Sequence, residues 1–403
     1  MGYLLIIMEF TEENNKQENN KQEYIIKSYE KWDELDLKDD LLRGIYSYGF
    51  DNPSQIQKLA IKPIIEGRDV IAQAQSGTGK TGTFTISSLQ TINIAEKTTQ
   101  AMILAPTHEL VKQISYVVEG IGSMMDGLVV KTLVGGTSVG EDIKQIKENV
   151  PHVIIGSTGR VNDMVRRQHI NMQTIKLFIL DEADEMLSGG FKEQVYQIFQ
   201  NLANECKVAV FSATMPPYML DMTNSFMKSP VKITMEPEKL NLEGIEQYYL
   251  ALNDDNEKYD NLKTLFEFLT VNQSIIYVNS VERVQDLYNA MTRDGYSVAC
   301  IHSSMKREER EKSFKDFRTG TYRVLISSNV TSRGIDIQQV SVVINFDIPK
   351  SVNTYLHRIG RSGRWGRKGT AINFITRQDI GYMKRIESHY KSNIQELPSE
   401  FKM

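Results

Sequence analysis

Short apolar runs rich in Val, Ile and Leu alternate along the chain with longer stretches in which apolar side chains recur every three or four residues. In the first part of the chain these runs are 69–73, 101–105, 129–134, 152–156, 177–180 and 207–212. Apolar runs of this length predict strands that are buried on both faces, and amphipathic stretches such as 109–121 predict the helices between them. The pattern therefore predicts a parallel sheet covered by helices.

The same pattern begins again after a charged stretch that contains Pro237 and Gly244. The later apolar runs are 274–278, 297–301, 323–327, 341–345 and 369–375. We therefore expect two α/β domains in tandem, at 28–235 and 246–403, joined by a linker at 236–245. Each domain is expected to bind its ligands at the carboxyl ends of its strands.

The composition narrows the class of protein. The 403 residues suffice for two or three domains, and 40% hydrophobic with 24% charged residues is typical of a globular protein. Residues 1–27 are mostly polar and predict a disordered tail, whose apolar run at 3–8 is too short to span a membrane. Cys206 and Cys300 provide neither a disulfide framework nor a zinc site, which predicts a reducing, intracellular compartment. We expect the cytoplasm rather than the nucleus. Abundant Asn, Lys and Ile are typical of an AT-rich genome, such as that of a parasite or a large DNA virus.

The charge distribution differs between the two parts of the chain. The net charge of −4 predicts no general electrostatic attraction to nucleic acid. Residues up to Ile245 include 24 basic and 32 acidic side chains, whereas the later residues include 23 basic and 19 acidic ones. The later part contains a basic cluster of Arg358, Arg361, Arg364, Arg367 and Lys368. A bound polyanion must therefore be held by local geometry.

A glycine-rich segment, Gln75-Ser-Gly-Thr-Gly-Lys-Thr81, follows the first predicted strand and precedes a helical stretch. Glycines in such a loop let backbone N–H groups turn toward phosphate oxygens, while Lys80 reaches the outer phosphates and Thr81 faces Mg²⁺. The remaining predicted phosphate contacts are Gln75, Ser76, Gly77, Thr78 and Gly79. The alternative is an ordinary glycine-rich turn, and Ala74 does stand where the strict pattern has Gly, but Gly-Lys-Thr at a helix start favours the phosphate loop.

Two carboxylates, Asp181 and Glu182, directly follow the predicted strand 177–180, within Asp181-Glu-Ala-Asp184. In a nucleoside triphosphatase the first carboxylate faces Mg²⁺, and the second orients or deprotonates the attacking water. A solvated acidic helix start is the alternative, because acidic side chains favour helix N-termini. The presence of Lys80 on the same predicted sheet favours the catalytic interpretation.

These two motifs together resemble those of the DEAD-box family of ATP-dependent RNA helicases, and the resemblance covers nearly the whole chain after the tail. It implies two tandem RecA-like domains, each a mostly parallel sheet flanked by helices. It also implies RNA-stimulated ATP hydrolysis, coupled to domain closure and to local RNA duplex unwinding or remodelling of RNA–protein complexes. Within the family the chain is most similar to the subgroup of translation initiation factor four-A and its exon-junction relative, which implies a translation-related role.

The segment Gly49-Phe-Asp-Asn-Pro-Ser-Gln-Ile-Gln57 resembles the Q motif of this family. The resemblance implies that Phe50 stacks on adenine, that Gln57 reads the adenine edge, and that Trp32 occupies the upstream aromatic position of the nucleotide site. An amide both donates and accepts hydrogen bonds, which suits adenine. ATP is therefore the implied nucleotide.

Three further segments resemble motifs that connect the two domains. Ser212-Ala-Thr214 resembles the motif that links hydrolysis to unwinding, and Ser332-Arg-Gly-Ile-Asp336 resembles the motif that contacts the nucleotide, here through Gly334 and Asp336. His357-Arg-Ile-Gly-Arg-Ser-Gly-Arg364 resembles the arginine-finger motif.

The arginine-finger motif has a mechanistic consequence. By resemblance, Arg361 and Arg364 meet the γ-phosphate and His357 joins the interlobe contacts. Guanidinium groups supplied by the opposite domain stabilise the transferring phosphoryl group only when the cleft is shut, so activity is expected to depend on closure. The alternative is a solvated basic helix, which the interleaved glycines disfavour.

The resemblance also implies RNA contacts, at Pro106, Thr107, Glu109, Gly136, Gly159 and Arg160 in the first domain and at Arg310, Ser328 and Gly334 in the second. Backbone amides at glycine turns and helix N-termini bind phosphates without reading bases, so sequence-independent binding is expected, with 2′-OH contacts favouring RNA. A helical-repeat scaffold protein is the implied partner of an expected monomer.

Several residues depart from the family pattern, namely His108 in place of Arg, Thr158 in place of Pro, Ser304 in place of Asp, Arg307 in place of Gln and Asn329 in place of Asp. Several of these positions belong to the RNA-contacting or interlobe side, so weaker RNA binding and unwinding is a hypothesis. An ATP-gated RNA clamp that serves as an assembly platform is the main alternative function. A DNA translocase is a weaker one.

Overall fold

The structure is a computed structural model that describes residues 26–75, 77–188, 190–234, 245–268, 273–329, 340–362 and 369–398. The chain divides into two compact units, residues 1–235 and 236–403. Residues 1–25 of the predicted tail and residues 236–244 of the predicted linker lie outside the described residues. No helix in the described part of the chain is both long and apolar enough to span a bilayer.

The first unit contains a seven-stranded parallel sheet. Its strands are β1 (Val70–Gln73), β2 (Ala101–Ala105), β3 (Val130–Leu133), β4 (Val153–Ser157), β5 (Leu177–Leu180), β6 (Lys207–Ser212) and β7 (Val231–Thr234). Their spatial order is β3-β4-β2-β5-β6-β1-β7, and every neighbouring pair is parallel. All carboxyl ends therefore meet at one edge, where the candidate site residues follow the strands.

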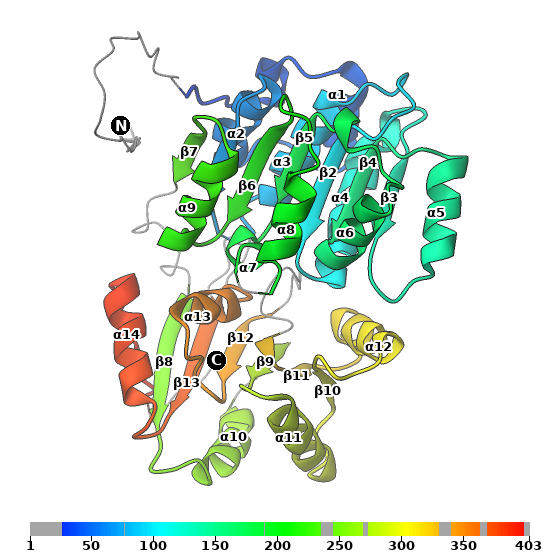
Figure 1. Ribbon diagram of the computed structural model, residues 1–403. Coiled ribbons are helices and arrows are strands. Elements are labelled where there is room, and N and C mark those ends of the chain that lie inside the picture. The colour runs from blue at the N-terminus through cyan, green and yellow to red at the C-terminus, as the bar shows by residue number, and fades with distance from the viewer. Residues whose placement is uncertain are drawn as a thin grey trace. The chain divides into compact units, whose positions relative to one another are not determined.

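Helices cover both faces of this sheet (Figure 1). One face packs against α1 (Asp39–Ser47), α2 (Gln55–Ile65), α3 (Lys80–Thr91) and α4 (His108–Ile121), with the 3-10 helices η1 (Trp32–Leu35) and η2 (Gly122–Met124) nearby. The other face packs against α5 (Val139–Glu148), α6 (Thr158–Arg166), α7 (Ala183–Met186), α8 (Lys192–Phe199) and α9 (Pro217–Phe226), with η3 (Met172–Thr174). Within β2, Ile103 faces the first group of helices and Met102 faces the second. Burial on both faces explains the uninterrupted apolar runs.

The second unit has its own seven-stranded parallel sheet. Its strands are β8 (Ile245–Ala251), β9 (Ser274–Tyr277), β10 (Val298–Ile301), β11 (Val324–Ser327), β12 (Val342–Asn345), β13 (Gly369–Ile375) and β14 (Gln395–Glu396). Their order, β10-β11-β9-β12-β13-β8-β14, repeats that of the first sheet strand for strand. The two tandem parallel sheets confirm the predicted fold class.

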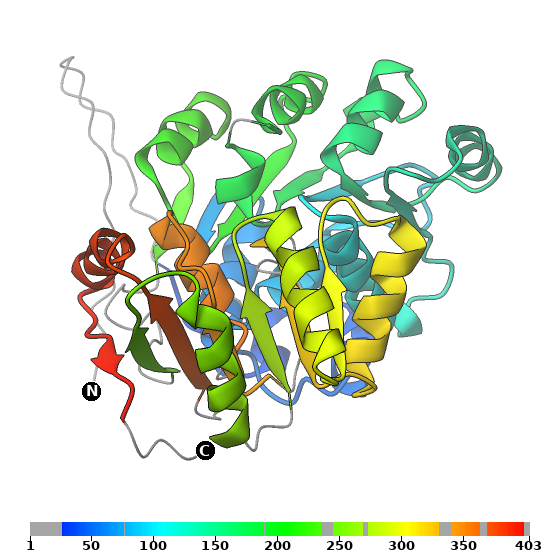
Figure 2. The ribbon, with the colours of Figure 1, turned by 90° about the horizontal axis from the view of Figure 1, so that it is seen from below.

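In the described part of the second unit, five helices flank the sheet, namely α10 (Glu257–Phe268), α11 (Val281–Arg293), α12 (Arg307–Arg318), α13 (Val352–Ile359) and α14 (Ile380–Tyr390). Two of them, α10 and α11, pack on one face, and α13 lies on the opposite face (Figure 2). The face that holds α13 is also covered by α12 and α14. The helix that carries the arginine-finger motif is thus packed against the core of its own unit.

The apolar runs identified in the sequence are strands, but β7, β8 and β14 were not among them. Ile245, expected at the end of the linker, is instead the first residue of β8, because its side chain packs into the core beside β13. These strands lie at or next to one edge of their sheets, and each includes polar residues. An edge position needs less apolar surface, so the sequence signal is weak there.

Candidate active site

The loop between β1 and α3 has the backbone that the phosphate-loop motif predicts. Gly77 and Gly79 have φ angles of 82° and 105°, in the left-handed region that favours glycine. A Cβ atom on Gly79 would lie 2.4 Å from Ser54 Oγ, so only glycine fits there. Lys80 is then the first residue of α3, and no acidic side chain lies in the first turn of that helix. Ser76 lies outside the described residues.

The Q-motif side chains pack directly against this loop. Gln57 is buried, its Oε1 accepts a hydrogen bond from Ser54 N at 2.7 Å, and its Nε2 donates to Gly79 O at 3.2 Å. A Cβ on Gly82 would lie 2.5 Å from Gln57 Nε2 and 2.9 Å from Phe50 Cε2. Because α2 and α3 are in contact here, the two motifs form one structure.

Trp32 lies behind Phe50. It is completely buried, and its Nε1 donates a hydrogen bond to Phe50 O at 2.9 Å. The two rings are stacked with their centroids 6.5 Å apart. Trp32 therefore supports the backbone and ring of Phe50 from the protein interior.

Lys80 and Glu182 approach each other beneath the loop. The ammonium of Lys80 is buried, and its Nζ lies 3.9 Å from Glu182 Oε1. In the described part of the chain, Lys80 Nζ has no hydrogen-bond acceptor. Burying a charge without hydrogen bonds is costly, so the position of this ammonium suits an anionic ligand that supplies the acceptors. Glu182 itself has a φ of 50°, an unfavourable backbone conformation that is frequent at functional sites.

Asp181 follows the last residue of β5 and is buried. Its Oδ1 accepts a hydrogen bond from Glu182 N at 3.0 Å. Burial, together with the neighbouring Glu182 carboxylate, raises the pKa of Asp181 to about 7. Carboxylates destabilised in this way are frequent at catalytic and metal-binding sites, because a bound cation restores their charged form.

The Ser-Ala-Thr motif contacts the Asp-Glu-Ala-Asp motif directly. Thr214 Oγ1 donates to Asp184 Oδ2 at 2.7 Å, and Tyr218 OH donates to Asp184 O at 2.8 Å. Ser212 Oγ accepts hydrogen bonds from the backbone N–H of Asp184 at 3.4 Å and of Thr214 at 3.3 Å. The sequence assigned the two motifs separate roles and did not predict this contact.

The first-unit residues expected to bind RNA cluster after three neighbouring strands, β2, β3 and β4. Pro106 and Thr107 follow β2, and Thr107 Oγ1 caps α4 by accepting from Leu110 N at 3.2 Å; Glu109 lies in the first turn of α4. Gly136 is exposed with a φ of 78° after β3, and Gly159 is exposed in the first turn of α6, after β4. The fold thus brings together residues that are up to 53 positions apart.

Arg160 differs from its exposed neighbour Gly159. Its guanidinium is buried, forms an ion pair with Asp142, and donates to Thr137 Oγ1 at 2.7 Å and to Thr137 O at 2.8 Å. Lys131 Nζ also lies 3.0 Å from Asp142 Oδ1. Arg160 therefore braces the turn between β3 and α5.

His108 lies over the same turn. Its Nε2 is 3.3 Å from the position that a Cβ on Gly135 would occupy. The histidine that replaces the family arginine is thus placed beside Gly136, in the group of residues expected to bind RNA. Thr158, another departure, is the buried first residue of α6.

In the second unit, Arg361 follows α13, is buried, and donates from Nε to His357 O at 3.2 Å. Arg310 lies on α12, and Ser328 O accepts from Ser327 Oγ at 2.7 Å just after β11. Burial of Arg358 and Arg361 excludes a solvated basic helix for these two residues. The other expected residues, Gly334, Asp336 and Arg364, lie outside the described residues.

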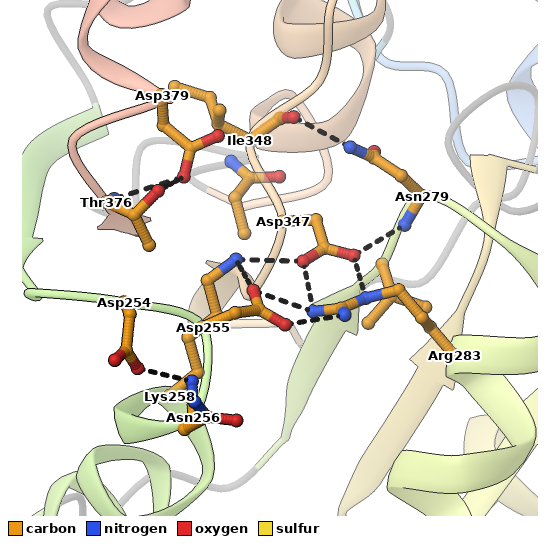
Figure 3. A network of polar contacts seen from close by, with 12 residues as sticks. Asp254, Asp255, Asn256, Lys258, Asn279, Arg283, Asp347, Ile348, Thr376 and Asp379 are labelled. Atoms are coloured by element: carbon orange, nitrogen blue, oxygen red, sulfur yellow. Dashed lines mark hydrogen bonds and ion pairs between the residues drawn. The ribbon is translucent and has the colours of Figure 1, made fainter.

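An ion-pair network that the sequence did not reveal surrounds Asp347, just after β12 (Figure 3). Arg283 donates to its two carboxylate oxygens at 2.7 Å each, and Lys258 Nζ lies 3.0 Å from Asp347 Oδ1. Both cations also pair with Asp255 (Figure 3). The only sequence signal was a charged residue at the end of an otherwise apolar strand.

Comparison with known proteins agrees with this geometry. Residues 54–222 match the DEAD/DEAH box helicase family, and residues 257–366 match the helicase conserved C-terminal domain. The chain therefore belongs to the DEAD-box family of ATP-dependent RNA helicases.

Among its relatives is the ATP-dependent RNA helicase eIF4A of Candida albicans, which is 48% identical over 370 residues, covering 92% of this chain and 93% of the relative. The eukaryotic initiation factor 4A of Caenorhabditis elegans is 46% identical, with 92% and 91% covered. Among solved structures, Saccharomyces cerevisiae Dbp5 bound to RNA and ADP BeF3 has a TM-score of 0.86 at 33% identity, with 91% of this chain and 95% of that chain covered. The resemblance seen in the sequence is confirmed.

Proposed function

We propose that this protein is an ATP-dependent RNA helicase of the initiation factor 4A type, in which RNA stimulates ATP hydrolysis and hydrolysis drives local duplex unwinding or remodelling of RNA–protein complexes in translation. The observation that carries this proposal is the buried Lys80 ammonium beside Asp181 and Glu182. Relatives named as RNA helicases or initiation factors support it, since they match the chain over about nine-tenths of its length.

ATP is bound by the first unit in this proposal. Phe50 stacks on adenine, Gln57 reads its edge, and Trp32 keeps Phe50 in place from behind. The phosphates lie against Gln75, Ser76, Gly77, Thr78, Gly79, Lys80 and Thr81. The left-handed backbone conformations of Gly77 and Gly79 support this assignment, because they let backbone N–H groups face a phosphate.

Mg²⁺ is the metal that this donor set fits, with Asp181 and Thr81 holding it largely through water. Carboxylate and hydroxyl oxygens are hard ligands, and the raised pKa of Asp181 marks a carboxylate that a cation stabilises. When bound, the ion neutralises charge on the phosphate oxygens. Glu182 orients the attacking water and accepts its proton, while Lys80 balances the charge of the phosphates.

The second unit completes the site in this proposal. Arg361 and Arg364 meet the γ-phosphate when the two units close, Gly334 and Asp336 contact the nucleotide, and His357 couples the units with Ser212 and Thr214. Planar guanidinium groups suit phosphate oxygens, and their arrival only on closure makes hydrolysis depend on RNA binding.

RNA is bound along the carboxyl edges of the sheets in this proposal. The residues involved are Pro106, Thr107, Glu109, Gly136, Gly159 and Arg160 in the first unit and Arg310 and Ser328 in the second. Arg160 acts by bracing the Gly136 turn, because its guanidinium is held by Asp142 and Thr137. A scaffold protein is proposed as partner; a yeast Dbp5 variant bound to Gle1 and IP6 supports this, with a TM-score of 0.78 and 32% identity.

The full-length protein with Glu182→Gln tests the proposal, with Glu193→Gln, an exposed carboxylate on α8, as the matched control. We expect RNA-stimulated ATP turnover in the natural chain and the control, and a loss of about 100-fold or more in Glu182→Gln. A natural chain whose ATP turnover is not stimulated by RNA contradicts the proposal. Slow turnover with long-lived RNA retention supports the clamp instead, and equal stimulation by single-stranded DNA supports a DNA translocase.

A further inference from the structure

One amide side chain lies beneath α13 on, or two residues after, each of five adjacent strands of the second sheet, and we call this set the amide ladder. In the spatial order β11-β9-β12-β13-β8, its members are Asn329, Asn279, Asn345, Asn373 and Gln247. The ladder is connected in its middle, where Asn345 Nδ2 donates to Asn373 Oδ1 at 2.8 Å. Asn345, Asn373 and Gln247 lie within strands and are buried, and amides are unusual there because each must find hydrogen-bond partners.

Arg358 of α13 inserts its guanidinium into one end of the ladder. It donates to Asn329 Oδ1 at 2.7 and 3.0 Å, to Asn279 Oδ1 at 2.8 Å and to Asn345 Oδ1 at 3.2 Å. It also donates to Asp347 O at 2.7 Å and lies 5.1 Å from the centre of the Tyr277 ring. The Arg358 side chain is completely buried, and its bonds to Asn345 and to Asp347 O lie in the interior, whereas those to Asn279 and Asn329 are partly exposed.

Among the described residues, only neutral oxygens accept the hydrogen bonds of Arg358. Within the described residues, no carboxylate lies at ion-pair distance from it. The nearby Asp347 carboxylate is bound by Arg283, Lys258 and Asn279 N, which fixes the Asp347 backbone that Arg358 contacts (Figure 3). A buried guanidinium held only by oriented dipoles requires accurate geometry, since the penalty for losing one acceptor is large.

Tyr355, one helical turn earlier, engages the other end of the ladder. Its hydroxyl donates to Gln247 Oε1 at 2.9 Å and accepts from Asn373 Nδ2 at 3.2 Å. Arg361 lies just beyond the end of α13, where its backbone N–H donates to Arg358 O at 3.2 Å. Tyr355 and Arg358 are three residues apart within α13, so their side chains lie on one side of the helix. Two anchored side chains on that side restrict both rotation and sliding of α13 on the sheet.

We propose that Arg358, together with Tyr355, is a positioning residue that uses the amide ladder to orient Arg361 for its approach to the γ-phosphate. The inference rests on the proposed function, because it presupposes that Arg361 acts on ATP. It adds a role for Arg358 and Tyr355, to which the motif resemblance assigned none. The physical requirement is that a phosphate-binding guanidinium must be held to within a fraction of an ångström.

Four variants of the full-length protein test this proposal. Arg358→Lys keeps the charge but not the planar fork, Tyr355→Phe removes one hydroxyl, and Arg361→Ala reports the contribution of the finger itself. Arg385→Lys on α14 is the matched control, because Arg385 is exposed and far from the ladder in sequence. The measurements are kcat and KM for ATP with saturating RNA, and the thermal melting midpoint.

We expect Arg358→Lys to lower kcat by about 10- to 100-fold through misplacement of Arg361. Tyr355→Phe should lower kcat by about 2- to 10-fold, the effect of one hydrogen bond. In both variants KM for ATP should stay within about 2-fold of the natural value, because the adenine and phosphate contacts of the first unit are untouched. The control should match the natural chain.

An unchanged kcat in folded Arg358→Lys, with Arg361→Ala inactive, overturns the inference and leaves the proposed function standing. If the kcat loss of Arg358→Lys is absent at temperatures well below the melting midpoint of that variant, the inference is also overturned, because the role of Arg358 is then only structural. If Arg358→Lys does not fold, the Tyr355→Phe variant tests the inference instead. A kcat of Tyr355→Phe equal to that of the natural chain overturns the inference. If Arg361→Ala has natural turnover, or the natural chain has none, the proposed function fails and the inference fails with it.

Discussion

Thr214 donates a hydrogen bond of 2.7 Å to the carboxylate of Asp184, and this bond joins two motifs at the ends of the neighbouring strands β5 and β6. Both side chains are buried. Asp184 lies two residues after Glu182, the proposed base, so we expect a displacement of the Ser-Ala-Thr segment to reach the proposed catalytic carboxylates. This contact would give the proposed coupling between hydrolysis and unwinding a physical basis in the first unit.

Thr214→Val removes the hydroxyl donor while keeping the shape of the side chain. We expect the free energy of unfolding to fall by about 1–3 kcal/mol, because a buried carboxylate loses a hydrogen-bond donor. RNA unwinding should fall more than ATP turnover. Urea denaturation and strand-displacement assays measure both effects, and Thr214→Ser, which keeps the hydroxyl, is the control. Unwinding by the valine variant at the rate of the serine variant would contradict the prediction.

Gly82→Ala tests the packing of the Q motif on α3. The added Cβ would lie 2.5 Å from Gln57 Nε2 and 2.9 Å from Phe50 Cε2, so both side chains must move. We expect KM for ATP to rise about 10-fold, as for the loss of one hydrogen bond of about 1.4 kcal/mol. Gly381→Ala on α14 is the control, since its Cβ would meet nothing within 4 Å. Equal KM values in the two variants would rule out this role.

The raised pKa of Asp181 predicts a pH dependence of stability in the absence of nucleotide and Mg²⁺. Between about pH 4 and pH 7 the folded protein holds a proton on Asp181 that the unfolded chain releases. The contribution of this group to the free energy of unfolding is therefore present at low pH and is lost as pH rises through 7. Chemical denaturation of the natural chain and of Asp181→Asn checks this. A difference between the two that does not vary with pH would contradict it.

His152 predicts a pH dependence of the opposite sign. Its Nδ1 accepts from Val129 N at 3.0 Å and its Nε2 lies 3.1 Å from Ile94 O, an arrangement that requires the neutral ring. Burial lowers the pKa of His152, so below about pH 6.5 the unfolded chain binds a proton that the folded protein excludes. The contribution of His152 to the free energy of unfolding is therefore lost as pH falls. His152→Gln should make the free energy of unfolding, measured by urea denaturation, less dependent on pH between about pH 5 and 7. An unchanged pH dependence in this variant would refute the prediction.

Local patterns in the sequence were sufficient to predict much of the fold and of the candidate site. Most apolar runs became strands that are buried on both faces of a parallel sheet, which requires continuous hydrophobicity, whereas the edge strand β3 is only partly buried. The phosphate loop and the Asp-Glu-Ala-Asp segment were recognisable because their chemistry requires particular residues at short spacing. The edge strands β7 and β14 were not predicted. They have four and two residues and include polar side chains, so they show little hydrophobic pattern.

The sequence alone determined the positions of most strands along the chain, the residues of the nucleotide loop and the family to which they belong, because these depend on short-range spacing. Tertiary structure alone decided that Thr214 reaches Asp184, that Gln57 packs on Gly79, and that Arg358 is inserted among amides from three strands. These contacts join residues up to 79 positions apart. They depend on which strands become neighbours in the sheet, and the crossovers that set this order are a property of the whole folded unit.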